Sequence, residues 1–194
     1  IDVAKRVVKR EIEIKDFIDK LTIHSRLVLW ITFSLIFSGA FLIFICEFNN
    51  PGTIGDMSLG DKILNCLFQS VTLRTAGFAS FSQGELEGAS VLISIVYMII
   101  GGSPVGTAGG VKTVTIVVLI ASAVSSIKNR NEVILFNRNL EKQAVIKAIA
   151  VVCMAFAIMF GSTLLLSAAM PQASSLDIAY ETVSATATVG LTRN

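Results

Sequence analysis

Residues 68–78 read FQSVTLRTAGF, and residues 180–191, near the C-terminus, read YETVSATATVGL. Aligned from their first residues, the two stretches correspond over five positions. A one-residue gap in the alignment then brings Thr75-Ala-Gly-Phe onto Thr188-Val-Gly-Leu. Each copy is short and polar and follows a long apolar run. A repeated polar insert in so hydrophobic a chain predicts a re-entrant helix followed by a loop that coordinates ions.

The composition is that of a membrane protein. Of the 194 residues, 53% are hydrophobic and only 15% are charged, which soluble domains rarely match. The net charge of +2 is too small to predict binding to nucleic acid. The three cysteines lie in apolar surroundings without metal-ligand spacing, and the single histidine has no ligand partner in view, so neither a disulfide nor a bound metal is expected.

The first residues of the sequence do not have the pattern of a signal peptide. Residues 1–26 hold seven Lys and Arg residues among apolar ones, which predicts an amphipathic helix at the membrane surface. Residues 11–15 alternate and would also fit a short strand. The sequence starts with Ile1 and stops at Asn194, directly after the second motif. We therefore expect it to be part of a longer membrane protein.

Hydropathy predicts an all-α multi-pass membrane protein. Residues 27–46 carry no charge and are long enough to cross a hydrocarbon core of about 30 Å. Residues 61–74 form a helix too short to cross, so the chain must return to the side it came from or lie flat. The first unit has a span at 27–46, a short pore helix at 61–74, a loop at 75–78 and a broken span at 89–127. The second unit has a span at 148–169, a pore helix at 177–187 and a loop at 188–191.

The distribution of charge predicts the orientation. Residues 1–26 and 128–147 hold twelve of the sixteen Lys and Arg residues, seven in the first segment and five in the second. Basic segments favour the cytoplasmic side. The N-terminal segment and the connection over 128–147 are therefore predicted to be cytoplasmic, and both re-entrant motifs enter from outside.

Each loop has the chemistry of a cation filter. A dehydrated cation needs oxygens to replace its water, and backbone carbonyls supply them along an extended, pore-lining chain. Two glycines admit backbone conformations that a Cβ forbids, two threonines place a hydroxyl beside the carbonyls, and a helix that ends at the loop adds partial negative charge. The alternative is two unrelated helix ends capped by Gly. The predicted filter residues are Thr75, Ala76, Gly77, Phe78, Thr188, Val189, Gly190 and Leu191.

Arg74 lies directly before the first loop, where a permanent charge is costly unless it has a partner. We expect it to pair with an acid behind the filter and to support the loop without touching ions. Glu181, on the other pore helix, is the candidate partner. The alternative is that Arg74 reaches the outer water.

Residues 101–110 interrupt the broken span with a Gly-rich run. Unpaired backbone at membrane depth is tolerated where it is buried in protein or lines water, so the interruption predicts a functional element. A phosphate-binding loop is excluded, because Val111 separates the last Gly from Lys112. We expect a flexible plug in which Lys112 repels cations; the alternative is a static kink with Lys112 extending to the cytoplasm. The predicted gating residues are Gly101, Gly102, Ser103, Pro104, Val105, Gly106, Thr107, Ala108, Gly109, Gly110 and Lys112.

Three motifs together resemble one family. FQSVTLRTAGF, the GGSPVGTAGGVKT run at 101–113 and VSATATVGLT at 183–192 are similar to the potassium-translocating membrane subunits of the Trk/Ktr/HKT superfamily. The LTIHSRLVL stretch at 21–29 also fits. The resemblance is closest to the bacterial Ktr-type subunit, which includes relatives once called sodium-transporting ATP synthase subunit J.

The resemblance implies four span–pore helix–span repeats around a pseudo-fourfold pore. This chain would supply the third repeat complete and the fourth through its filter, so that each loop lines one quarter of the filter. It also implies a homodimer in the cell membrane, surrounded by lipid, on a cytosolic ring of nucleotide-binding regulatory subunits. Sodium typically promotes uptake by Ktr-type members, and the Gly in both loops favours potassium over sodium.

These observations predict a potassium uptake subunit that binds no cofactor covalently and holds only permeating ions. The alternative is a sodium-conducting subunit, or a non-conducting membrane subunit of an ion-pumping complex. An enzyme is excluded, because the sequence has one His, no catalytic grouping of acids and no workable nucleotide motif.

Overall fold

The computed structural model describes residues 23–102, 109–128, 134–135, 138–140 and 142–193 of the chain. The regular secondary structure of the described part is almost wholly helical, as predicted, with helices α3 to α8. The exception is a small antiparallel hairpin of β1 (Ile134–Leu135) and β2 (Arg138–Asn139), within the connection predicted over 128–147. The amphipathic segment predicted over 1–26 lies outside the described residues except for its last four.

Two helices are long and apolar enough to cross a membrane, α3 (Ile23–Glu47) and α7 (Lys142–Ala169). Both begin a few residues before the predicted spans. α3 ends where Asn-Asn-Pro-Gly turns the chain. Large apolar side chains on both helices are exposed, a surface that suits contact with lipid; they include Trp30, Phe33, Phe37, Phe41, Met154, Phe160 and Leu165.

The first short helix, α4 (Leu59–Thr72), turns the chain back along α3. Its N-terminus is capped by Ser58, whose Oγ accepts the backbone N–H of Asp61 at 3.3 Å. The helix begins and ends two residues earlier than the predicted range of 61–74, so Arg74 lies beyond its C-terminus. Ser70 fixes the helix to the span by donating to the carbonyl of Ile36 at 2.8 Å.

The predicted broken span consists of two helices, α5 (Gly88–Ile99) and α6 (Thr113–Ile127). The chain between them is closed at its base. The N–H of Gly101 donates to the carbonyl of Val111 at 2.9 Å, and the N–H of Val111 donates to the carbonyl of Ile99 at 3.0 Å. Backbone hydrogen bonds therefore join the two described sides of the interruption and form a neck between α5 and α6.

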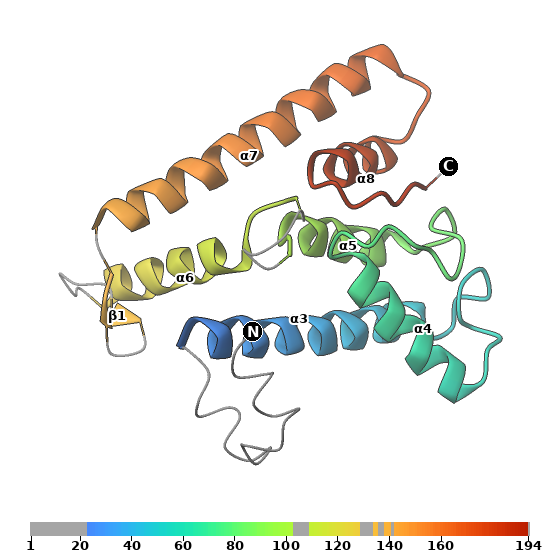
Figure 1. Cartoon of the computed structure of the whole chain (residues 1–194). Helices are drawn as coiled ribbons and strands as arrows, with labels where there is room; N and C mark the ends of the chain where they lie inside the picture. The colour runs from blue at the N-terminus through green and yellow to red at the C-terminus, as the bar shows by residue number, and fades with distance from the viewer. Residues whose placement is uncertain (1–22, 103–108, 129–133, 136–137, 141, 194) are drawn as a thin grey trace, which may run out of the picture.

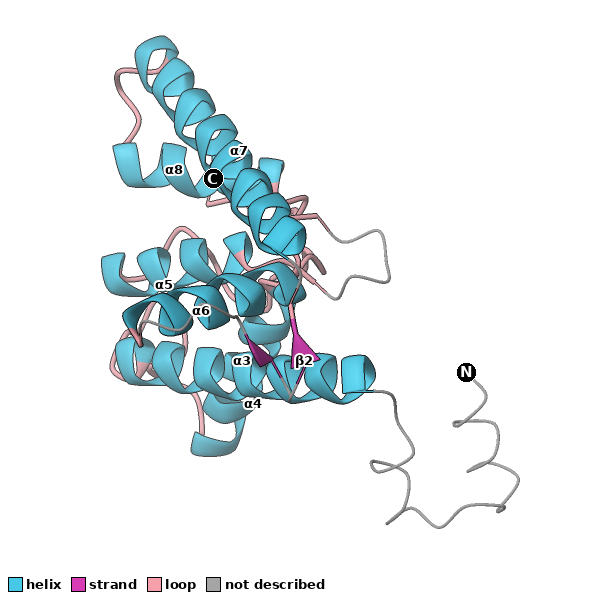
Figure 2. Ribbon diagram, turned by 90° about the vertical axis from the view of Figure 1, so that its left-hand side faces the viewer, coloured by secondary structure: helices cyan, strands magenta, loops and turns pink. Residues whose placement is uncertain are grey.

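The helices form three layers (Figures 1 and 2). α3 and α4 make one layer, α5 and α6 lie in the middle, and α7 with α8 (Ser175–Thr186) makes the third. α8 contacts both α7 and α5. The buried core takes side chains from α3, α4, α5 and α8 and from the segments between them, and its fully buried side chains include Ile43, Ile54, Cys66, Leu73, Val91, Met98 and Tyr180. The layering brings the two copies of the polar motif together.

Candidate functional site

The first loop, residues 75–78, has two residues with a left-handed backbone. Thr75 has φ of 70° and Gly77 has φ of 77°. The loop folds back on α4 through one side chain, since the Thr72 hydroxyl donates to the carbonyl of Phe78 at 2.6 Å and accepts its N–H at 2.8 Å. The N–H of Ala76 also donates to the carbonyl of Thr72 at 3.2 Å. Thr72 therefore holds the loop at both ends.

The second loop, residues 188–191, has the same construction. Thr188 has φ of 54° and Gly190 has φ of 89°. Ser184 stands where Thr72 stands in the first copy, and its hydroxyl donates to the carbonyl of Leu191 at 2.6 Å. The N–H of Val189 donates to the carbonyl of Ser184 at 2.8 Å. The two copies thus match in backbone conformation and in the hydroxyl that holds the loop, as well as in sequence.

This backbone pattern suits cation coordination. Successive carbonyls of an ordinary extended chain point to opposite sides, and a change of handedness at every second residue brings them toward one side. A left-handed non-Gly residue costs about 1–3 kcal/mol, and such strain clusters at functional sites. The same strain at Thr75 and Thr188 makes the two loops a candidate ion site.

The two loops lie against each other. A Cβ built on Gly77 would stand 2.6 Å from the carbonyl oxygen of Val189, and one built on Gly190 would stand 3.5 Å from the Cα of Gly77. Gly77 is therefore needed for its backbone conformation and for close approach, whereas Gly190 is needed mainly for its conformation.

The Gly-rich run reaches the second loop. The N–H of Gly109 donates to the Thr188 hydroxyl at 3.0 Å, and a Cβ on Gly109 would stand 2.5 Å from the carbonyl oxygen of Ala187. Residues 103–108 of the predicted gate lie outside the described part of the chain. Lys112 directly precedes α6. Beside this contact is a mostly apolar cavity of about 160 Å³, lined by Gly110, Ala155, Ile158, Met159, Thr186 and Ala187.

Arg74 and Glu181 do not form the predicted ion pair. Glu181 Oε1 accepts the Thr192 hydroxyl and the N–H of Arg193, both at 2.7 Å. The Nε of Arg74 is buried and has no hydrogen-bond partner among the described residues. The physical reason is register, because Glu181 matches Gln69, which lies more than one helical turn before Arg74. A role of either residue in supporting the filter stays a prediction.

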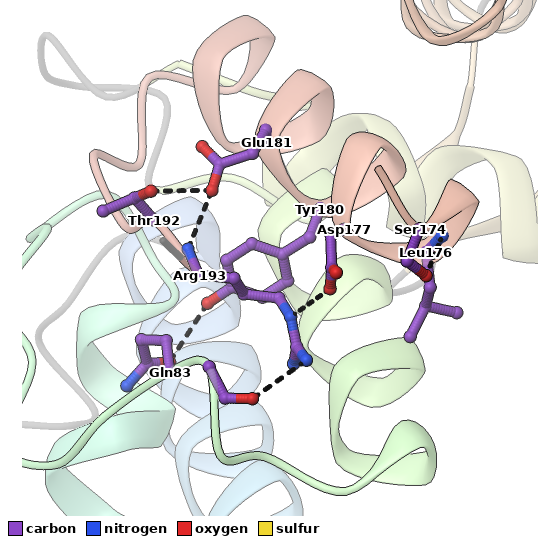
Figure 3. Close-up of polar contacts among 9 residues, drawn as sticks. Gln83, Ser174, Leu176, Asp177, Tyr180, Glu181, Thr192 and Arg193 are labelled. Carbon is purple, nitrogen blue, oxygen red and sulfur yellow. Dashed lines mark hydrogen bonds and ion pairs between the residues drawn. The ribbon is translucent and has the colours of Figure 1, made fainter. Parts of the chain in front are cut away.

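Sequence reasoning missed Gln83, which lies in the turn-rich segment after the first loop. Its Oε1 accepts the Gln69 Nε2 at 2.6 Å and the Tyr180 hydroxyl at 3.0 Å. Its Nε2 donates to Gln69 Oε1 at 3.2 Å and to the carbonyl of Phe81 at 3.1 Å. No motif marks this residue. Its contact with Tyr180 joins parts of the chain 97 positions apart (Figure 3).

Arg193 makes a second link between the copies. Its Nε forms an ion pair with Asp177 at 2.6 Å, and its Nη2 donates to the carbonyl of Gly84 at 3.2 Å. Figure 3 shows both contacts beside the ring of Tyr180. Arg193 therefore ties the N-terminal half of α8 to the segment that follows the first loop.

Glu47 is a fully buried carboxylate at the end of α3. Its Oε2 accepts the Asn50 side-chain amide at 2.6 Å and the Thr53 hydroxyl at 2.7 Å. Its Oε1 accepts the N–H of Glu87 at 3.0 Å, just before α5 begins. A buried charge needs such partners. Glu47 thus joins the end of the first span to the start of α5 and fixes the far end of the segment that contains Gln83.

The fold defines a class, a largely helical protein with two helices that are long and apolar enough to cross a membrane. The model of the TrkH family, described as cation transport protein, matches residues 10–193. The chain belongs to this family. The family consists of transporters and not enzymes, so the prediction of a Trk/Ktr-type membrane subunit is confirmed.

Curated relatives agree with the family. The chain is 35% identical over 171 residues to the Ktr system potassium uptake protein B of Bacillus subtilis, covering 88% of this chain and 38% of that protein. It is 34% identical over 173 residues to the protein of the same name from Vibrio alginolyticus, covering 89% and 38%. It is 31% identical over 189 residues to the potassium/sodium uptake protein NtpJ of Enterococcus hirae, covering 96% and 42%. The chain thus spans about two fifths of these relatives' length.

Proposed function

We propose that this chain forms part of a potassium uptake pathway across the cell membrane, in which residues 75–78 and 188–191 each line one quarter of a selectivity filter. The observation that carries the proposal is the matched backbone of the two loops, with positive φ at Thr75, Gly77, Thr188 and Gly190. The names of the relatives, potassium uptake protein and potassium/sodium uptake protein, fit the same permeating ion.

The proposed arrangement places α3, α4, α5 and α6 in one complete repeat, and α7 with α8 in the next. These are the third and fourth repeats of a pseudo-fourfold pore, with α4 and α8 as pore helices that enter from outside. The basic segments over 1–26 and 128–147 then lie in the cytoplasm, because they carry most of the Lys and Arg residues.

The Gly-rich run 101–110, together with Lys112, is proposed as the gate of this pathway. The hydrogen bond from Gly109 to the Thr188 hydroxyl supports the proposal, because it brings the end of the run to the start of the second loop. The hydrogen-bonded neck at Gly101 and Val111 would let the loop change position without separating α5 from α6.

The proposed assembly is a homodimer in lipid, bound on its cytoplasmic side to a ring of nucleotide-binding regulatory subunits. Cytoplasmic basic segments would supply the surface for that ring. Sodium is proposed as an activator of uptake. A sodium-conducting protein is the second candidate, and the name of the Enterococcus hirae relative, which includes both ions, favours it.

The test is ion flux through the full-length protein that contains this sequence, purified and placed in liposomes. We expect potassium to pass in preference to sodium. Gly190→Ser is a better test than the same change at Gly77, since a Cβ at position 190 would meet only the Cα of Gly77, at 3.5 Å. The substitution should lower the preference for potassium over sodium. Equal permeability of both ions in the unaltered protein would favour the second candidate, and no flux would overturn both.

A further inference from the structure

A buried glutamine joins the two pore helices behind the loops. The side chain of Gln83 is 3% exposed, and its partners Gln69 and Tyr180 are both 0% exposed. Gln69 belongs to α4 and Tyr180 to α8, and the Oε1 of Gln83 accepts a hydrogen bond from each, at 2.6 and 3.0 Å. One carbonyl oxygen therefore receives donors from both copies of the repeat.

A comparison of the two copies shows which of these hydrogen bonds crosses from one copy to the other. Glu181 stands where Gln69 stands, and it binds the segment after its own loop through Thr192 and Arg193. Gln69 likewise binds the segment after its own loop, through Gln83. Each copy thus ties its pore helix to the segment after its own loop. We call these segments, residues 79–87 and 192–193, the exit segments. The Tyr180 hydroxyl instead crosses from the second copy to the first.

We propose that Gln83 is a positioning residue for selectivity, which fixes the spacing of the two filter loops through its hydrogen bond with Tyr180. The inference rests on the proposed function and deepens it. Gln83 touches no ion; it acts through Tyr180 and Gln69, which lie on the helices that end at the loops.

The physical basis is the closeness of the two loops. Their backbones already meet at Gly77 and Val189, so a small rotation of α8 against α4 would change the distance between the coordinating carbonyls. Selectivity by carbonyls depends on the number and arrangement of the oxygens around the ion. A buried, fully paired network resists such a rotation, because each of its polar groups would lose a partner.

The other end of the exit segment is fixed independently. Glu47 accepts the N–H of Glu87, four residues after Gln83, and Arg193 donates to the carbonyl of the adjacent Gly84. Gln83 is therefore held on a segment anchored at α3 and at the second copy. An anchored amide can set the position of a helix, whereas an amide on a free loop would follow it.

The experiment measures the potassium-to-sodium permeability ratio of the full-length protein in liposomes. Tyr180→Phe removes only the hydroxyl that crosses between the copies and keeps the ring in the core. We expect it to lower the preference for potassium by about two- to tenfold, the range set by the loss of one neutral hydrogen bond. Gln83→Met, which removes both links and keeps a similar volume, should lower it further.

The matched control is Tyr97→Phe. The Tyr97 hydroxyl is hydrogen-bonded to Ser38 at 2.8 Å, but this contact joins α5 to α3 within one copy. The control should leave the permeability ratio unchanged. Elution as a single folded species and a melting temperature lowered no more than that of Tyr97→Phe would exclude general damage in Tyr180→Phe.

The outcomes separate the two proposals. Selective flux in the unaltered protein with an unchanged ratio in folded Tyr180→Phe overturns the role of Gln83 alone. An equal loss of selectivity in Tyr97→Phe also overturns it, because any loosening of the bundle would then suffice. Absence of selective flux in the unaltered protein overturns the proposed function instead.

Discussion

The two copies of the repeat build the same loop from different side chains. The first uses Thr72 and a buried amide pair, Gln69 with Gln83, whereas the second uses Ser184 and the carboxylate of Glu181. What the copies share is the place where each contact ends, which is the loop or the segment after it. The loop backbone is therefore the common element, and the side chains that hold it differ between the copies. Thr72 and Ser184 serve equally, because each hydroxyl reaches the carbonyl at the end of its loop.

The contacts with the preceding span also differ between the copies. In the first copy Ser70 donates to the carbonyl of Ile36. In the second the corresponding Thr182 is hydrogen-bonded to the hydroxyl of Thr163 at 2.7 Å. A Cβ on Gly39 would stand 2.5 Å from the Ser70 hydroxyl. The first copy therefore packs against the backbone of its span, and the second against a side chain.

The largest difference between the copies should appear at the two loop glycines. Gly77→Ala places a methyl group 2.6 Å from the Val189 carbonyl oxygen in a left-handed residue, whereas Gly190→Ala brings mainly the conformational cost of about 1–2 kcal/mol. We expect Gly77→Ala to abolish potassium flux and to lower the melting temperature more than Gly190→Ala. The measurement is flux and thermal unfolding of the full-length protein carrying each variant.

The relative effects of Gly77→Ala and Gly190→Ala on flux and melting temperature test this prediction. If Gly190→Ala proved as harmful as Gly77→Ala, the close approach of the loops would not be what distinguishes them. Gly161→Ala is a suitable control, because a Cβ there meets no atom within 4 Å and the residue lies in α7. It should leave flux unchanged.

A smaller effect is expected at the two carboxylates that hold the exit segments. Glu47 uses both oxygens to accept three donors, so Glu47→Gln must turn an NH2 group toward another donor. This should destabilise the protein by about 1–3 kcal/mol. Glu181 accepts both of its donors at Oε1, and Glu181→Gln keeps that oxygen, so it should cost less than about 1 kcal/mol.

The check is thermal unfolding of the full-length protein with each substitution, at one lipid and salt concentration. A larger loss for Glu181→Gln would contradict the comparison. It would show that the charge of Glu181 does something beyond accepting Thr192 and Arg193. Glu47→Asp offers a second variant, since it keeps the charge but is too short to reach all three donors.

The sequence allowed a helical membrane protein of this family to be predicted, because hydropathy is a local signal, whereas the repeat of span, short helix and loop stays a prediction. Helix ends differed by a few residues, as at α4, where Ser58 caps the helix ahead of the predicted start. Gln83 and Arg193 could not be predicted as links, because their partners lie far away in sequence or in the other copy. The predicted pairing of Arg74 with Glu181 was wrong on register, because Glu181 corresponds to Gln69 and accepts Thr192 and Arg193 instead.

The smallest expected effect concerns the two loop threonines, which share a backbone conformation but differ in their neighbours. The Thr188 hydroxyl accepts the N–H of Gly109, so Thr188→Val should free the end of the Gly-rich run while keeping the shape of the side chain. This hydrogen bond is exposed, and its loss should raise basal potassium flux by only about two- to tenfold. Thr188→Ser keeps the hydroxyl and should restore the basal flux. Thr75→Val makes the same substitution in the first loop and tests whether the rise in flux is specific to the second. A rise in leak as large as that of Thr188→Val would mean that the effect comes from the filter and not from the Gly-rich run.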